Sequence, residues 1–256
     1  MRAVVQFSGG VGSWAAARRV AAQIGADNVT LLFADTKIED PDLYRFLAEA
    51  AGNIGSELIV LADGRTPWEV FRDERFIGNT RVDICSRVLK RDLLRSYIEE
   101  HYDPADTAIV LGIDWTEVHR YDRAVPRWHP WCVLAPLVEE SSSKEDLLEE
   151  LRSCGLRPPD LYLKGFPHNN CGGFCVKAGQ SQFRLLLEQM PDRYAWHEGQ
   201  EQQTIAAIGK QVAILRDRRG GQTKPMTLRD FRLRLENDGQ AEVPDDEWGG
   251  CGCALD

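Results

Sequence analysis

The chain has 256 residues, of which 43% are hydrophobic and 28% are charged, and its 40 acidic and 31 basic side chains give a formal net charge of −9. At roughly 100–200 residues per domain, this suits one large α/β domain or a domain with an appendage, and it excludes a disordered chain and a mini-protein. No apolar run approaches the roughly 18–20 residues that span a bilayer, and residues 1–7 lead into a strand-like segment without a signal-peptide pattern. We therefore expect a cytoplasmic protein with no membrane partner.

Short β-branched runs alternate with helical stretches over the first 115 residues, which is the pattern of a parallel sheet covered on both faces. These runs predict strands over residues 3–7, 28–35, 57–62 and 107–113. Apolar residues at helical spacing predict helices over 13–24, 42–54 and 87–101, the second of them capped by Asp40. Further helices are predicted over 144–153, 182–189, 198–215 and 227–236, with a turn-rich stretch at 155–179.

The segment between the first strand and the first helix, Ser8-Gly9-Gly10-Val11-Gly12-Ser13, has the composition of a phosphate-binding loop. Glycines let the backbone turn and approach a ligand closely, and exposed amides at a helix N-terminus attract an anion. The segment matches neither the Walker A motif nor the Rossmann GxGxxG fingerprint, and a plain glycine- and serine-rich turn is the alternative. The predicted nucleotide-binding residues of this loop are Ser8, Gly9, Gly10, Gly12 and Ser13.

This loop resembles the PP-loop of the adenine nucleotide alpha-hydrolase-like enzymes, whose common form is SGGxDS; Gly12 stands where that form has Asp. Later segments resemble, in the same order, motifs of the phosphoadenosine phosphosulfate reductase family within that superfamily. They are Asp35-Thr36 followed by Glu39-Asp40-Pro41, the stretch from Gly112 to Arg120, Ala135-Pro136-Leu137 with Glu145-Asp146-Leu147, and residues 159–166 followed by a cysteine pair. The matched segments reach across about the first 180 residues.

The resemblance implies an α/β fold with a doubly wound parallel sheet of about five strands, of the HUP type, and an adenine nucleotide at its carboxyl edge. The general rule for open α/β sheets places a ligand at the same edge. The implied organisation is a nucleotide-binding domain over residues 1–140, a helical, cysteine-containing extension over 141–235 and an acidic tail over 236–256.

Residues that follow the predicted strands are candidates for contact with the nucleotide. Asp35, Thr36 and Gly112 are expected beside it, and Asp35 is also a candidate Mg²⁺ ligand. Lys90 and Arg120 lie inside matched motifs and are expected to contact phosphate or sulfate. Arg65 and Arg81 are further candidates for such contacts, and His119 and His168 are candidate proton donors.

Seven cysteines, an odd number with six of them beyond residue 128, argue against a secreted disulfide framework. Cys85 begins the third predicted helix beside basic residues, so its pKa is expected to be lowered. Cys171 and Cys175 flank a glycine turn, and Cys251 and Cys253 lie on the tail. The remaining two, Cys132 and Cys154, are expected to be structural.

The clustered cysteines have three alternative interpretations. Cys85, Cys171 and Cys175, with Cys251 or Cys253 as fourth ligand, are candidates for a [4Fe–4S] cluster or zinc. In the second interpretation the tail cysteines act as a mobile redox nucleophile, similar in placement to the C-terminal cysteine of the cluster-free reductases. In the third they are small buried residues. Two departures from the pattern of the cluster-bearing family members weaken the metal-site interpretation: Ser86 replaces a second cysteine, and a CxxxC spacing replaces CxxC.

Three functions remain open from the sequence. The first is cleavage of ATP to AMP and pyrophosphate, which activates a substrate for sulfur transfer. The second is a thiol- or Fe–S-dependent adenylyl-sulfate reductase, in which a thiolate attacks sulfur and a thiol reductant or sulfur-donor protein is the partner. The catalytic candidates are Cys85, Lys90, Arg120, Cys251 and Cys253.

The third function is a nucleotide-sensing module whose basic segment, residues 210–234, contacts nucleic acid or protein. Neutralisation of this segment by the acidic tail is the favoured interpretation, because the tail follows it directly in the chain. The sequence leaves the acceptor substrate and the oligomeric state open.

Overall fold

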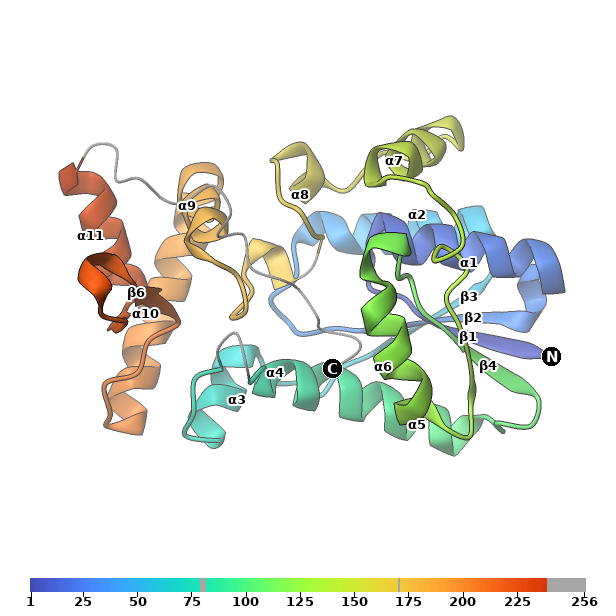
Figure 1. Cartoon of the computed structure of the whole chain (residues 1–256), viewed down its shortest axis with the longest axis horizontal. Helices are drawn as coiled ribbons and strands as arrows, with labels where there is room; N and C mark the ends of the chain where they lie inside the picture. The colour runs from blue at the N-terminus through green and yellow to red at the C-terminus, as the bar shows by residue number, and fades with distance from the viewer. Residues whose placement is uncertain (79–81, 170, 239–256) are drawn as a thin grey trace.

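The computed structural model describes residues 1–78, 82–169 and 171–238, and it is an α/β protein built on a five-stranded, all-parallel sheet (Figure 1). The spatial order is β3-β2-β1-β4-β5, so the winding of the chain reverses between β1 and β4. The strands are β1 (Arg2–Gln6), β2 (Val29–Ala34), β3 (Glu57–Leu61), β4 (Thr107–Val110) and β5 (Cys132–Leu134). The first four match predicted strands. The range of β5 was not predicted, because three residues give too little pattern.

Alternate residues of the strands fill two hydrophobic layers, one on each face of the sheet. Val5 and Leu31 pack in the layer that includes α1 and α2, whereas Val4 and Leu32 pack in the layer that includes α5 and α6. Figure 1 shows α1 and α2 on one side of the sheet and α5 on the other. The helices of these layers are α1 (Val11–Ile24), α2 (Pro41–Ile54), α7 (Lys144–Ser153), α5 (Leu93–His101) and α6 (Val118–Trp128).

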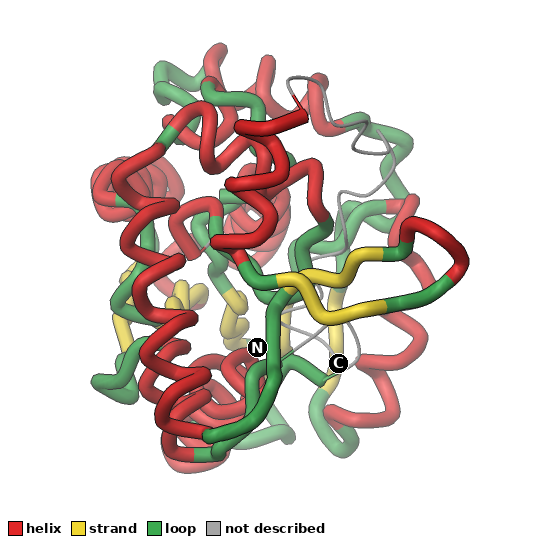
Figure 2. The backbone as a smooth tube through the Cα atoms, turned by 90° about the vertical axis from the view of Figure 1, so that its left-hand side faces the viewer, coloured by secondary structure: helices red, strands yellow, loops and turns green. Residues whose placement is uncertain are grey.

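A second hydrophobic core lies beside the carboxyl edge of the sheet, and its largest buried side chains include Trp68, Phe174, Tyr194 and Phe231. Its helices are α3 (Pro67–Asp73), α8 (Asp160–Leu163), α9 (Gln180–Gln189), α10 (Pro191–Ile208) and α11 (Leu228–Asp238). Figure 2 shows the antiparallel hairpin of β6 (Leu215–Asp217) and β7 (Lys224–Met226) at the front of this part.

The expected domain boundary at residue 140 does not separate the two cores. Trp68 and Leu89 pack in the second core, although they precede the boundary, and Leu147 and Leu151 of α7 pack on the sheet, although they follow it. The two parts are therefore joined by chain that crosses between them in both directions.

The predicted helix over residues 198–215 is wrong in its bounds. Pro191 lies in the first turn of α10, and Gly209, with φ +71°, ends the helix in the left-handed conformation. Residues 215–217 instead form a strand. The other predicted helices are confirmed within two residues at either end, except that the first part of 87–101 is divided into α4 (Ile84–Ser86) and the π-helical segment η2 (Arg87–Asp92).

Within the described residues, the basic segment over residues 210–234 pairs with acids of the protein body and with Glu236, the first residue of the expected tail. Arg232 pairs with Glu198 of α10 at 2.8 Å and with Glu236 at 2.9 Å, and Arg219 pairs with Asp217 at 2.9 Å. Residues 239–256 of the expected tail lie outside the described residues. In the described chain, no helix combines the length and apolar character needed to cross a bilayer.

Glu201 joins α10 to the start of α11 and to the residue before β6. From α10, its carboxylate accepts hydrogen bonds from the backbone N–H of Ile214 at 3.0 Å and of Leu228 at 2.6 Å. The residue is fully buried, and burial raises the pKa of its carboxyl to about 7. The Glu201 carboxyl binds its proton more tightly in the folded state than in the unfolded state. The contribution of Glu201 to the free energy of unfolding is therefore fully present below about pH 4.5 and declines as the pH rises to about 7.

We expect Glu201→Ala to lower the free energy of unfolding by about 2–4 kcal/mol, because two buried N–H groups lose their acceptor. Urea unfolding measures this, with the exposed Glu188→Ala on α9 as the control that changes little. The stability difference between wild type and Glu201→Ala should shrink as the pH rises from about 4.5 to about 7. A difference that is absent or that grows with pH would contradict the role of Glu201.

Candidate functional site

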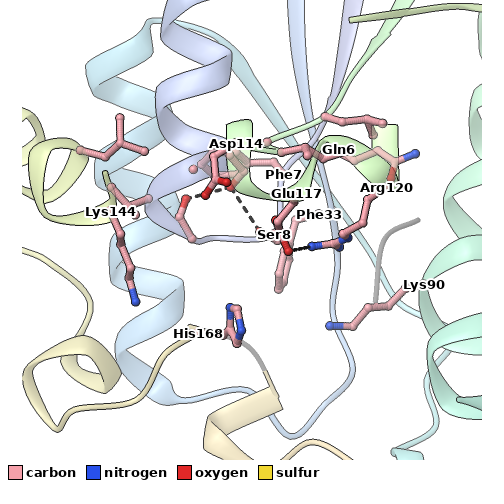
Figure 3. A pocket seen from close by; sticks show the side chains of 18 of the residues that line it. Gln6, Phe7, Ser8, Phe33, Lys90, Asp114, Glu117, Arg120, Lys144 and His168 are labelled. Carbon is pink, nitrogen blue, oxygen red and sulfur yellow. Dashed lines mark hydrogen bonds and ion pairs between the residues drawn. The ribbon is translucent and has the colours of Figure 1, made fainter. Parts of the chain in front are cut away.

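A cavity of about 350 Å³ lies at the carboxyl edge of the sheet (Figure 3). The ends of β1, β2 and β4 form one wall, and the loop before α1 forms another. Because the winding reverses between β1 and β4, the cavity lies at the topological switch point, where open α/β sheets bind ligands. The predicted site residues that line it are Ser8, Gly10, Gly12, Ser13, Lys90, Gly112, Arg120 and His168.

Two glycines let the loop lie directly against the end of β4. A Cβ atom on Gly112 would fall 2.6 Å from both the N and the Cα of Ser13, and one on Gly12 would fall 3.0 Å from the Gly112 carbonyl oxygen. Neither position has room for a side chain without movement of the backbone. This close approach gives a physical reason for Gly12 where the SGGxDS form has Asp.

Gly9 shapes the loop without lining the cavity. Its φ is +75°, and a Cβ atom there would fall 2.2 Å from Cδ1 of Leu43. Its carbonyl oxygen accepts a hydrogen bond from Nδ2 of the buried Asn169 at 2.8 Å. Gly9 therefore anchors the loop to the chain that precedes Cys171.

The N-terminus of α1 faces the cavity. The helix begins after Gly10, which has no side chain to cap it, and its first turn has no acidic residue. The N–H of Val11 donates to the Tyr162 hydroxyl at 3.3 Å. The hydroxyl of Ser13 donates to the Gly10 carbonyl at 2.9 Å, and the hydroxyl of Ser8 donates to Ser13 at 3.3 Å. The helix dipole and the first-turn amides thus offer the features of an anion site.

Lys144, which sequence analysis missed, adds a cation to this site. Its Nζ donates to the Pro167 carbonyl at 2.6 Å and lies 4.0 Å from the centre of the Tyr162 ring. Burial lowers the pKa of Lys144, and it forms no salt bridge with a carboxylate in the described ranges. A lysine in the first turn of a helix opposes the helix dipole, and this unfavourable position was a signal in the sequence.

Arg120 and two acidic residues form the wall contributed by the chain after β4. Arg120 pairs with Glu117, and its Nε is buried without a hydrogen-bond partner in the described chain. The Asp114 carboxylate accepts from the backbone N–H of Thr116 at 2.8 Å and from its hydroxyl at 2.6 Å. Figure 3 shows Asp114, Glu117 and Arg120 together at the cavity, with Lys90, Lys144 and His168 around the same space.

Asp35 and Thr36 do not line this cavity, although both were expected at the nucleotide. The Asp35 carboxylate accepts from Lys37 Nζ at 2.8 Å and from the Tyr44 hydroxyl at 2.9 Å. Burial acts to raise the pKa of Asp35, but these hydrogen bonds outweigh it and leave the pKa below its ordinary value. The oxygens proposed to bind Mg²⁺ are therefore already used within the protein.

Three predicted cysteines line a second, smaller cavity together with Thr36 and Lys90. Lys90 also lines the first cavity, and its Nζ lies 3.5 Å from Cys171 Sγ and 3.7 Å from Glu39 Oε1. In the part of the chain that the structure describes, no three His, Cys, Asp or Glu side chains group closely enough to hold a metal ion. The cysteines of this cavity are Cys85, Cys171 and Cys175.

Cys251 and Cys253, the tail candidates, lie outside the described residues. The [4Fe–4S] and zinc alternatives both need a ligand from that tail to complete the set of four. The cluster stays a prediction, which iron and acid-labile sulfide analysis of anaerobically purified protein would test.

The expected lowering of the Cys85 pKa is wrong. Burial raises the pKa of this thiol to about 12; nearby Asp83 raises it further, and Lys90 only partly opposes this. The helix that begins here, α4, is a three-residue turn, so it offers little dipole, and Arg87 is exposed. Arg81 lies outside the described residues. In this structure Cys85 is a neutral thiol near pH 7.

The remaining candidates lie away from the cavity. Arg65 pairs with Asp63 at 2.6 Å and with Asp73 at 2.9 Å on the surface, and His119 is exposed and does not line the cavity. Cys154 is half-buried as expected of a structural residue, whereas Cys132 is exposed on β5.

No protein-family model matches the chain, and a search of curated proteins finds no match. The functional assignment therefore depends on the cavity at the switch point and on the side chains that line it.

Proposed function

We propose that this chain is an enzyme of the PP-loop type, related to the phosphoadenosine phosphosulfate reductases, with a HUP-type sheet. It binds ATP in the cavity at the switch point and cleaves it to AMP and pyrophosphate, which activates a substrate for sulfur transfer. The observation that supports this best is the convergence of a glycine-rich helix N-terminus with Lys90, Arg120 and Lys144 on one cavity.

The polar part of the cavity suits a polyphosphate. The amides at the start of α1 are hydrogen-bond donors for phosphate oxygens. The hydroxyls of Ser8 and Ser13 become donors when a phosphate replaces their present acceptors, Ser13 and the Gly10 carbonyl. Burial removes part of the water around the Lys144 ammonium group, and no carboxylate of the described chain pairs with it. A bound phosphate would supply the missing negative charge. The phosphates therefore belong at the α1 end of the cavity.

The apolar part of the cavity suits a nucleoside. Leu32, Leu94 and Ile113 line it and belong to the hydrophobic layer between the sheet and α5. A purine ring buried there is removed from water, while its phosphates stay at the helix N-terminus.

In the proposed reaction, a nucleophilic oxygen of the acceptor substrate attacks the α-phosphorus. A bond from that oxygen to phosphorus forms, and the bond from phosphorus to the bridging oxygen breaks, so that pyrophosphate leaves with the electron pair. Lys90 and Arg120 offset the charge that develops on the phosphorus oxygens, and the amides of α1 and Lys144 stabilise the leaving pyrophosphate. A sulfur nucleophile then attacks the activated substrate and displaces AMP.

Mg²⁺ fits the oxygen donors of this cavity. Asp114 and Glu117 present carboxylates at its wall, and hard cations of this kind prefer oxygen ligands. These residues would hold the ion in place of Asp35, and when bound the ion neutralises charge on the phosphates.

The second cavity supports the sulfur-transfer half of the proposal. Its three cysteines adjoin the nucleotide cavity through Lys90, which contacts Cys171. The same proximity is compatible with a sulfonucleotide reductase, in which a thiolate attacks the sulfur of an adenylyl sulfate. The two reactions differ in their products, pyrophosphate in one and sulfite in the other.

We expect Gly112→Ala to abolish ATP binding, because the added methyl group would lie 2.6 Å from the backbone of Ser13 and push the start of α1 away from β4. Gly52→Ala is the matched control, since a Cβ atom there meets nothing within 4 Å. Calorimetric titration with ATP measures both variants, and thermal unfolding checks that both are folded. Wild-type affinity in a folded Gly112→Ala protein would contradict the proposed loop geometry.

We expect Lys144→Met to weaken ATP binding by about 10-fold to 100-fold, the range for loss of one charge-assisted hydrogen bond. The free energy of unfolding should change little, because removal of a charge that opposes the dipole of α7 offsets the lost hydrogen bond to the Pro167 carbonyl. Lys164→Met, on the turn after α8, is the control of the same chemistry outside the cavity. Equal affinities of the wild type and Lys144→Met for ATP would show that Lys144 does not contribute to ATP binding.

The proposed reaction is tested by incubating anaerobically purified protein with ATP and, separately, with adenylyl sulfates, and by following pyrophosphate, AMP and sulfite. Because no acceptor substrate is added, water takes its place at the α-phosphorus, and we expect slow release of pyrophosphate and AMP from ATP and no sulfite from the adenylyl sulfates. Sulfite release would instead establish the reductase, and tight binding without turnover would indicate a nucleotide-sensing module.

A further inference from the structure

Gln6 is a buried polar side chain at the end of β1 without a hydrogen-bond partner. Only 6% of the residue is exposed, and its Oε1 is buried with no partner in the described chain. Its Nε2 forms no hydrogen bond with the described residues either. Buried amides are nearly always paired, so an unpaired one that lines a cavity indicates a missing ligand group.

The side chain of Gln6 belongs to the apolar part of the cavity. Gln6 pairs in register with Leu32 of β2, and alternation along β1 directs it to the same face as Val4, toward the layer of α5. Leu32, Leu94 and Ile113 line the cavity on that face. Gln6 therefore shares this face with the apolar residues where the proposed function places the base.

We propose that Gln6 selects adenine in this cavity, an inference that rests on the proposed function. A glutamine amide pairs with adenine through two hydrogen bonds: its Oε1 accepts from the 6-amino group, and its Nε2 donates to N7. Because Oε1 is buried in this structure, the pairing requires the amide to turn about its last side-chain torsion. Guanine presents two acceptors at the same edge, so it leaves Oε1 facing a carbonyl oxygen. Both ends of the buried amide are satisfied only by the adenine edge.

The test compares the binding of ATP with that of purine riboside triphosphate, which differs from ATP only in lacking the 6-amino group. We expect wild-type protein to bind ATP about 10-fold or more tightly than the analogue, as for a base whose bidentate pair is broken. In Gln6→Leu the two affinities should become equal through a loss of ATP affinity. Gln6→Glu, which keeps the shape but cannot donate to N7, should also bind ATP more weakly.

The controls separate recognition from folding. Leucine replaces the unpaired amide with an apolar side chain of similar size, so thermal unfolding of Gln6→Leu should match the wild type or improve on it. Gln203→Leu, an exposed position on α10, should leave both affinities unchanged.

Each outcome decides a different claim. Equal wild-type affinities for ATP and the analogue, or an ATP preference that survives in Gln6→Leu, would overturn the role of Gln6 and leave the proposed function standing. Failure of wild-type protein to bind either nucleotide would overturn the proposed function and the role of Gln6 with it.

Discussion

The contact between the loop before α1 and the end of β4 determines the rest of the candidate site. With glycine at positions 12 and 112, the backbones approach so closely that a Cβ on Gly112 would fall 2.6 Å from Ser13. This approach brings the N-terminus of α1 to the point where the winding of the sheet reverses. The electrostatic field of the helix and the opening at the switch point thus coincide, and the cations of η2, α6 and α7 surround the same space.

The two hydrophobic cores are held together at this edge. Lys90 lines the nucleotide cavity and the cysteine cavity, and Gly9 accepts a hydrogen bond from Asn169 beside the cysteine turn. Arg193 of α10 donates to the carbonyl oxygens of Ile38 at 2.9 Å and of Gly172 at 3.2 Å, which connects the second core to the chain after β2. A nucleotide in the first cavity would therefore lie within reach of the elements that position the cysteines.

Much of the sheet part was predictable because its sequence is locally consistent. Buried parallel strands are apolar runs, and the Asp40 cap that was predicted for α2 accepts from the Asp42 N–H at 3.0 Å. The helix α3 was missed, although Thr66 and Glu69 form a capping box that is readable in the sequence. The bounds of α10 failed because apolar residues continue past Gly209 into a strand whose partner lies farther along the chain.

Site residues that act through the backbone, such as the glycines of the loop, were predictable from the sequence. Site residues whose role depends on tertiary contacts of the side chain were less predictable. The glycine loop was identified from its place between a strand and a helix. Gln6 depends on what surrounds it in space, which spacing along the chain does not reveal, and the one signal for Lys144 was its position in the first turn of a helix. The pKa of Cys85 was predicted in the wrong direction, because burial outweighs nearby positive charge.

Amide hydrogen exchange with and without ATP tests the central claim most directly, because the proposed phosphate ligands include backbone N–H groups. We expect slower exchange on ATP addition in residues 9–14 and 111–117, with little change in the hairpin of β6 and β7. Unchanged exchange in both of these segments at saturating ATP, or slowing confined to the second core, would contradict the central claim.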